Sequence, residues 1–322
     1  MGGGELATPP AGRRRPAKDH RVAAALGLSH TLILGFVAGA TIMLGLPVGR
    51  LRSPRHSRAT AALRVYLTSA SVGVLVFILW DLLAQAWQII TASLNPPGGG
   101  LLRPAELAIL LVVGLGAGLL SLARYERWLT RERVTPQPLV TRTLGAMLGG
   151  PGAMAATELS EVSKRAERAP SPAQRLALLI AVGIGLHNFG EGLALGGSAA
   201  QGKIGLATLL VTGFALHNAT EGFGIIAPLA ADPERPTWRF LLGMGVIGGG
   251  PTLLGTAVGS QFTNDPITLL FLTVAAGSIL YVIIQLVTLA VTGARRTALY
   301  WGMWTGLAAG FATDLLLTAG GA

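Results

Sequence analysis

Two short segments of the sequence combine residue types that bind metal ions. Residues 187–192 read His-Asn-Phe-Gly-Glu-Gly and residues 217–222 read His-Asn-Ala-Thr-Glu-Gly, so the pattern His-Asn-x-x-Glu-Gly occurs twice. Because residues four apart share one face of an α-helix, His187 lies one turn from Glu191, and His217 lies one turn from Glu221. Imidazole nitrogen and carboxylate oxygen are ligands that zinc prefers, and Fe, Mn or Cd would also suit them.

The elements that carry these segments are predicted to cross a membrane. Of the 322 residues, 51% are hydrophobic and only 12% are charged, and the mean hydropathy is +0.57. A hydrocarbon core about 30 Å thick needs roughly 20 apolar residues per helix. Eight stretches are long enough, which predicts an all-α polytopic membrane bundle with eight transmembrane helices. They cover residues 23–48, 61–91, 101–122, 173–199, 203–230, 238–262, 266–292 and 297–320.

The distribution of basic residues predicts the orientation of these spans. Most of the 25 Lys and Arg residues follow spans one, three, five and seven, so the positive-inside rule places both termini outside. Residues 1–22 are predicted to be a disordered basic tail, and residues 123–172 a cytoplasmic loop within the domain 23–320. The net charge of +10 therefore belongs to loops, and no nucleic-acid partner is expected. Gly and Ala richness and short loops favour a prokaryotic plasma membrane.

The two motifs fall in the fourth and fifth spans, where their carboxylates cannot face lipid. A carboxylate near the bilayer centre is costly and must find a partner or a wet cavity. Neither span offers a Lys or Arg near Glu191 or Glu221, and the chain has no Cys. We therefore expect the helix faces that carry the His and Glu residues of the two motifs to face each other. Together they would form one metal site from His187, Glu191, His217 and Glu221. The structural alternative is that these groups merely cross-link helices through hydrogen bonds.

Other polar or irregular positions in the spans are candidates for the transport path. Asp81 and Asp314 fall toward the outer ends of spans two and eight, where they would make an electronegative mouth for cations. Residues 248–251, Gly-Gly-Gly-Pro, would either break span six and expose carbonyls or allow close packing of small residues. Gln285 in span seven is a polar group that would bond across helices.

The paired motifs in spans four and five, with a long loop after span three, resemble the ZIP family of zinc and iron transporters. The resemblance implies a membrane-bound transporter, not an enzyme, which moves divalent metal toward the cytoplasm as cargo and uses no catalytic cofactor. It implies Asn188 and Asn218 as ligands or near-ligands beside the His and Glu residues. It also implies an elevator-like or rocking motion and a homodimer.

The sequence departs from the family pattern at the residue before each Glu, where Pro is usual and this chain has Gly190 and Thr220. Span six lacks the Glu that some members use for a second metal, and Gln285 stands in a region where Glu is common. Two carboxylates balance one divalent charge, so we predict a single metal ion. Two rival functions stay open: an intramembrane zinc-dependent hydrolase, and a channel or scaffold that binds no metal.

Overall fold

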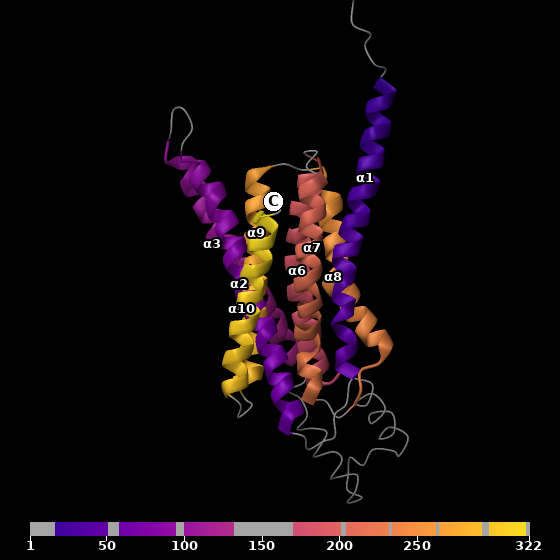
Figure 1. Cartoon of the computed structure of the whole chain (residues 1–322). Helices are drawn as coiled ribbons and strands as arrows, with labels where there is room; N and C mark the ends of the chain where they lie inside the picture. The colour runs from indigo at the N-terminus through magenta and orange to yellow at the C-terminus, as the bar shows by residue number, and fades with distance from the viewer. Residues whose placement is uncertain are drawn as a thin grey trace, which may run out of the picture.

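The structure is a bundle of long α-helices that run roughly parallel and antiparallel to one axis (Figure 1). This computed structural model describes residues 17–50, 58–94, 100–131, 170–200, 204–231, 234–261, 264–291 and 296–319. In these ranges the chain forms eight α-helices, three 3₁₀ helices and no strand. The elements are α1 (Ala17–Ala40), η1 (Thr41–Leu44), η2 (Leu46–Arg50), α2 (Arg58–Ala92), α3 (Leu102–Arg131), α6 (Pro172–Ala200), α7 (Ile204–Ile226), η3 (Ala227–Ala231), α8 (Trp238–Gly259), α9 (Asp265–Val291) and α10 (Arg296–Ala319).

The helices match the eight predicted spans in number and order. Six segments have the length and apolar composition of a membrane crossing. They are Gly27–Arg50, Ala62–Ala92, Leu102–Leu129, Pro172–Ala200, Trp238–Gly259 and Asp265–Val291. The other two predicted spans, 203–230 and 297–320, coincide with α7 and α10. The all-α membrane bundle is confirmed, and the chain is an integral membrane protein.

Three segments differ in detail from the prediction. The first span is not one helix, because α1 gives way to 3₁₀ turns at Thr41, and Pro47 follows shortly after. Helix α1 also begins at Ala17, inside the segment 1–22 predicted to be a disordered tail, while residues 1–16 lie outside the described ranges. Helix α3 continues to Arg131 with a charged sequence that favours helix beyond the membrane. The rest of the predicted loop, residues 132–169, is likewise outside the described ranges.

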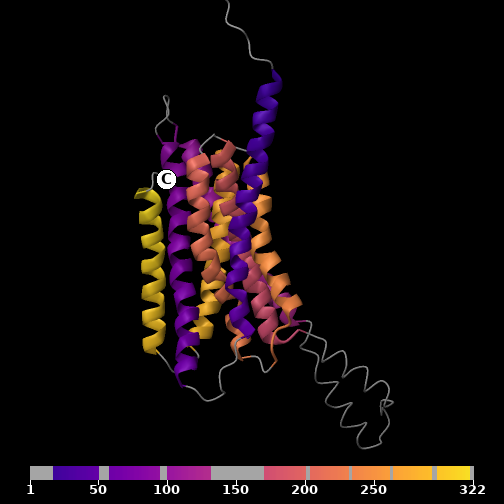
Figure 2. The same ribbon diagram turned by 45° about the vertical axis from the view of Figure 1, so that its right-hand side comes forward.

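Glycines let several pairs of helices approach to backbone contact. Helix α6 lies against α8, where a side chain on Gly192 would collide with the Thr252 carbonyl. Helix α1 crosses α8 where Gly39 and Gly249 meet backbone to backbone. On the other side, α2 packs against α10, and α3 packs against α9. Figure 2 shows α10 at the left edge of the bundle, beside α2.

The Gly-Gly-Gly-Pro segment of α8 serves close packing, which was one of its two predicted roles. Helix α8 runs without interruption from Trp238 to Gly259, with Pro251 inside it. Gly248 lies against Ile42 and Ile225, and Gly249 lies against α1. The helix therefore packs closely against its neighbours without a break, as small residues permit in membrane bundles.

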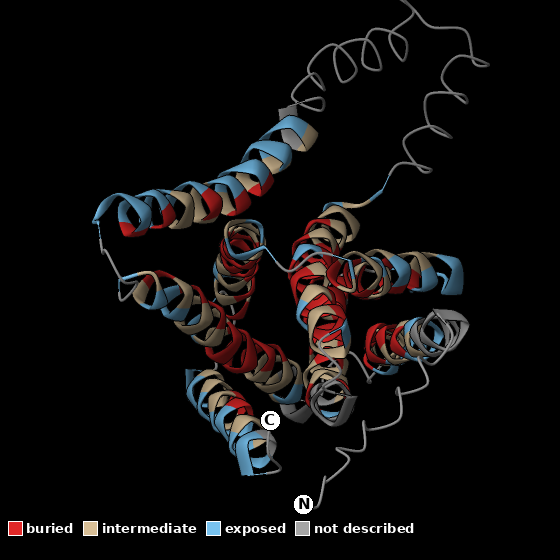
Figure 3. Ribbon diagram, turned by 90° about the horizontal axis from the view of Figure 1, so that it is seen from above, coloured by how far each residue is buried: buried red, intermediate tan, exposed pale blue. Residues whose placement is uncertain are grey.

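Buried side chains gather on the inner faces of the helices, whereas the outer faces carry large exposed hydrophobic groups (Figure 3). Val112 on α3, Val246 on α8 and Leu315 on α10 are each more than half exposed. An apolar perimeter of this kind is stable against lipid tails and unfavourable against water. The polar groups of α6 and α7 are enclosed within this perimeter.

Candidate metal centre

The two His-Asn-x-x-Glu-Gly motifs lie inside α6 and α7, which are consecutive antiparallel helices in contact. The His and Glu residues of each motif lie on the side of their helix that faces the other motif. The imidazole rings of His187 and His217 have centroids 6.2 Å apart. Only the His217 side chain retains appreciable exposure, at 16%. The buried motif residues are His187, Asn188, Glu191, Asn218 and Glu221. Both motifs therefore converge in the interior of the bundle, as their spacing predicted.

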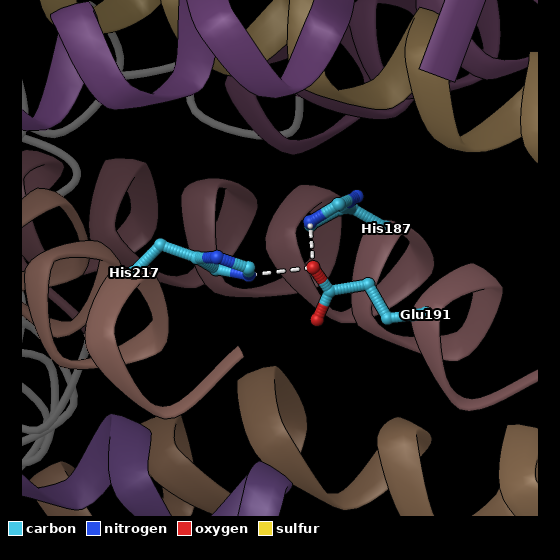
Figure 4. Close-up of side chains that lie close together, drawn as sticks. All are labelled: His187, Glu191 and His217. Carbon is cyan, nitrogen blue, oxygen red and sulfur yellow. Dashed lines mark hydrogen bonds and ion pairs between the residues drawn. The ribbon is translucent and has the colours of Figure 1, made fainter. Parts of the chain in front are cut away.

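One carboxylate oxygen of Glu191 is the meeting point of the two imidazoles (Figure 4). The Oε1 atom of Glu191 lies 2.5 Å from His217 Nε2 and 3.1 Å from His187 Nε2. The second oxygen, Oε2, is buried and makes no hydrogen bond with the described residues. Three metal-binding side chains from two helices are thus gathered around one point.

Glu221 lies beside this group and approaches the same nitrogen of His187 as Glu191 does. Its Oε1 atom is 3.6 Å from His187 Nε2, and the side chain is 1% exposed. Neither of its oxygens has a hydrogen-bond partner within the part of the chain that the structure describes. An ionised carboxylate without a partner is expensive to bury, so Glu221 calls for a cation or a proton.

The spacing of these atoms fits a first-row metal ion. Donor atoms of His187, Glu191 and His217 all lie within 4.8 Å of one another. A tetrahedral site with bonds of about 2.1 Å holds its ligand atoms about 3.4 Å apart. The measured separations of 2.5, 3.1 and 3.6 Å bracket this value. Small side-chain adjustments would therefore bring two nitrogens and two oxygens to one ion.

The two asparagines donate their amide NH₂ groups to the backbone of two other helices. Asn188 Nδ2 donates to the carbonyl of Gly248 on α8, and Asn218 Nδ2 donates to the carbonyl of Ala38 on α1. Both bonds are 2.9 Å long and buried. The Oδ1 atoms of both residues are buried and accept no hydrogen bond from the described residues. No pattern of residue types could have predicted these partners, because a backbone carbonyl is available at every residue.

A cavity of about 440 Å³ leads to the cluster from one end of the bundle. It is lined by His187, Glu191 and His217 at its inner end, and by Asp81 and Asp314 farther along α2 and α10. The predicted acidic residues therefore lie in the same cavity as His187, Glu191 and His217. Gln85, which sequence reasoning missed, also lines it and donates to Asp81 Oδ2 at 2.8 Å. Its position four residues after Asp81 on the same helix face was the available signal.

Gln285 lies elsewhere in the bundle. Its Nε2 atom donates to Glu126 Oε2 on α3 at 2.9 Å, and the Tyr281 hydroxyl donates to the same oxygen at 3.0 Å. None of these three residues lines the cavity. Gln285 bonds across helices, as expected, but the structure does not bring it to His187 and Glu191.

Comparison with known proteins places these motifs in a family. No curated protein matches the chain. Residues 152–291 match the family model described as the ZIP zinc transporter. The matched segment contains α6, α7, α8 and α9, and with them both motifs and every member of the His-Glu cluster. This match agrees with the ZIP resemblance that the paired motifs predicted, and it covers 140 of the 322 residues.

Proposed function

We propose that this protein carries zinc, or Fe, Mn or Cd, toward the cytoplasm through a single site between α6 and α7. The match of residues 152–291 to the ZIP zinc transporter model supports transport of divalent metal in general. The observation that carries the specific proposal is the convergence of two imidazoles on Glu191 Oε1, with Glu221 Oε1 3.6 Å from His187 Nε2 beside them. His187, Glu191, His217 and Glu221 are the proposed ligands, and Asn188 and Asn218 are near-ligands.

The charge and type of these donors favour one divalent transition-metal ion. Two carboxylates balance two positive charges, and two neutral imidazoles add nitrogen donors that zinc favours over calcium or magnesium. A second divalent ion at the same place would leave a net charge in a membrane interior. Part of the cluster faces the cavity, so water can complete the coordination and the ion can leave again.

The cavity supplies the path by which the ion reaches the site. Asp81 and Asp314 give its walls negative charge, which raises the local concentration of cations. Beyond the site the way is closed, because Ile184 and Ile225, one turn past His187 and Glu221, are fully buried in an apolar cluster. The site is therefore open toward one end of the bundle only.

The distribution of basic residues supports an outward orientation of the open end. The ends at which α1 stops and α2 starts carry Arg50, Arg58 and Arg64, and Arg175 begins α6 at that same end of the bundle. The cavity opens at the opposite end, where α10 finishes and α1 starts (Figure 1). By the positive-inside rule the arginine end faces the cytoplasm, so both termini lie outside and the cavity receives metal from outside.

Release to the cytoplasm requires the helices that hold the ion to move against their neighbours. The backbone contacts between α6 and α8, and between α1 and α8, support movement of these helices as one unit. Helices α2, α9 and α10, which form the opposite wall, would remain as the frame. This rocking or elevator-like motion, and assembly as a homodimer, follow from the family resemblance.

The rival hydrolase function is not favoured. Intramembrane zinc peptidases place a general-base Glu between two His residues as His-Glu-x-x-His, an order that this chain does not contain. In this cluster Glu191 Oε1 lies between the two imidazoles, as a ligand that shares an ion with them would.

Zinc flux into liposomes tests the transport proposal. Purified protein should carry Zn²⁺ into vesicles, and His217→Ala should remove most of this flux because one nitrogen ligand is lost. The matched control is His30→Ala, which changes an exposed imidazole on α1 outside the cavity. Equal flux from wild type and His217→Ala would contradict the proposed site, and cleavage of a membrane peptide without flux would support the hydrolase.

A further inference from the structure

The asparagine of each motif makes the same kind of contact with a different helix. Asn188 follows His187 on α6 and donates to Gly248 on α8, while Asn218 follows His217 on α7 and donates to α1. Both side chains are fully buried. Each metal-binding imidazole thus has, as its immediate neighbour, a side chain tied to the backbone of another helix.

The partner fixes which end of each amide faces the neighbouring helix. A backbone carbonyl can only accept, so the NH₂ group must face Gly248 or Ala38 and the amide oxygen must face away. Only an amide supplies such a donor here with the size and neutral charge of Asn. An aspartate would have nearly the same shape but would set a carboxylate oxygen against a carbonyl oxygen.

The two acceptor carbonyls lie at one crossing of α1 and α8. Gly248 and Ala38 directly precede Gly249 and Gly39, the pair of glycines whose backbones touch. The α1 helix changes to 3₁₀ geometry three residues after Ala38, and α8 contains Pro251 three residues after Gly248. The anchors therefore join α6 and α7 to the same rigid point on opposite sides.

We propose that Asn188 and Asn218 are positioning residues, whose NH₂ groups anchor α6 and α7 to the α1–α8 crossing and thereby hold His187 and His217 at metal-binding distance. This inference rests on the proposed function of the His-Glu cluster. A hydrogen bond on the residue next to each His limits rotation and sliding of its helix. Metal coordination tolerates only small errors in ligand position, so loss of an anchor should release one imidazole from the ion.

Substitution by Asp separates anchoring from direct coordination. If these residues acted only as oxygen ligands, Asn188→Asp or Asn218→Asp would bind a divalent ion as well as or better than the wild type. If they act as anchors, the same variants lose the donor and repel the carbonyl. We expect Zn²⁺ affinity to fall at least about tenfold, as typical for residues that orient metal ligands.

The number of imidazoles bound to the metal distinguishes the two roles, because loss of an oxygen ligand alone would leave this number at two. Full-length protein in detergent is loaded with Co²⁺ or Zn²⁺, and X-ray absorption counts the coordinating imidazoles. The wild type should show two and each anchor variant one. Ser278→Ala and Ser71→Ala are matched controls, because they remove a buried hydrogen bond to Gly183 of α6 and a partly buried one to Thr220 of α7. Both should retain two imidazoles and an affinity within about twofold.

Two imidazoles and undiminished affinity in Asn188→Asp and Asn218→Asp would overturn the inference. Should the Asp variants fail to fold, Asn188→Ala and Asn218→Ala decide the question, because the anchor role predicts one imidazole and a plain ligand role predicts two. His187→Ala separates this outcome from failure of the proposed function. If His187→Ala binds Zn²⁺ as the wild type does, the proposed metal site itself is wrong. If His187→Ala loses Zn²⁺ binding but the Asn variants bind Zn²⁺ like the wild type, only the anchoring role is refuted.

Discussion

Replacing Glu191 by Gln should weaken zinc binding more than any other isosteric change in the protein. The carboxylate touches both imidazoles through a single oxygen, so it stands at the centre of the cluster. Glutamine preserves the shape and one carbonyl oxygen but removes the negative charge. Binding of a divalent ion would then leave an uncompensated positive charge in the membrane interior.

The size of the effect follows from the distances in the cluster. An ion held among donor atoms that all lie within 4.8 Å of one another is less than about 4 Å from the carboxylate. Two unit charges at 4 Å interact by about 4 kcal/mol at an effective dielectric constant of about 20, and a divalent ion doubles this to about 8 kcal/mol. If the amide oxygen and local relaxation restore two thirds of that, about 2.7 kcal/mol is lost, or about 100-fold in Kd.

Competition with a zinc-binding dye in detergent measures this loss directly. Glu126→Gln is the matched control, because Glu126 is also a carboxylate between helices but bonds Tyr281 and Gln285 outside the cavity. Its Kd for Zn²⁺ should stay within about threefold of the wild type. If Glu191→Gln also bound within threefold of the wild type, the reasoning that makes Glu191 the central ligand would be refuted.

Three further predictions concern the path, the pH dependence and the packing. Asp81→Asn combined with Asp314→Asn should lower the rate of uptake at limiting zinc, most at low ionic strength, and leave the maximal rate nearly unchanged; a salt-independent defect would contradict the electrostatic role. Zinc binding should weaken between pH 7.5 and 5.5 because protons compete for imidazole lone pairs, and a flat titration would contradict coordination by His. Gly249→Val should lower the melting temperature in detergent, because its side chain would overlap the Gly39 carbonyl, whereas Gly250→Ala, which meets only Val246 at 3.8 Å, should melt like the wild type.

The fold and the centre of the site could be predicted because both depend on local periodicity and on the cost of burying charge. Long apolar stretches define the spans, whatever their tertiary partners are. The spacing between His187 and Glu191 places both on one helix face, and the membrane excludes that face from lipid. With two such helices consecutive in the chain, mutual contact is the simplest way to enclose both carboxylates. The structure places the two helix faces together for these reasons.

Details that depend on tertiary contact could not be read in the same way. The 3₁₀ turns after Ala40 continue an apolar stretch, so composition alone gives one uninterrupted span there. Helix α3 continues to Arg131 although its last turns are charged, because the charged residues are good helix formers once outside the membrane. Gln285 looked like a member of the path because it is polar in an apolar span, but its partner is Glu126 on a distant part of the sequence.

The asparagines show where the limit of sequence reasoning lies. Asn188 and Asn218 sit beside the metal-binding histidines in the sequence, so adjacency alone assigns them to the ion. A helix turns by about 100° per residue, however, and neighbours along the chain face different directions. The side chain after each His must therefore face a different neighbour, and that neighbour is set by the crossing of α1 and α8 at Gly39 and Gly249. A repeated motif can thus hold two kinds of residue, one that binds the ion and one that binds the backbone of the adjoining helix.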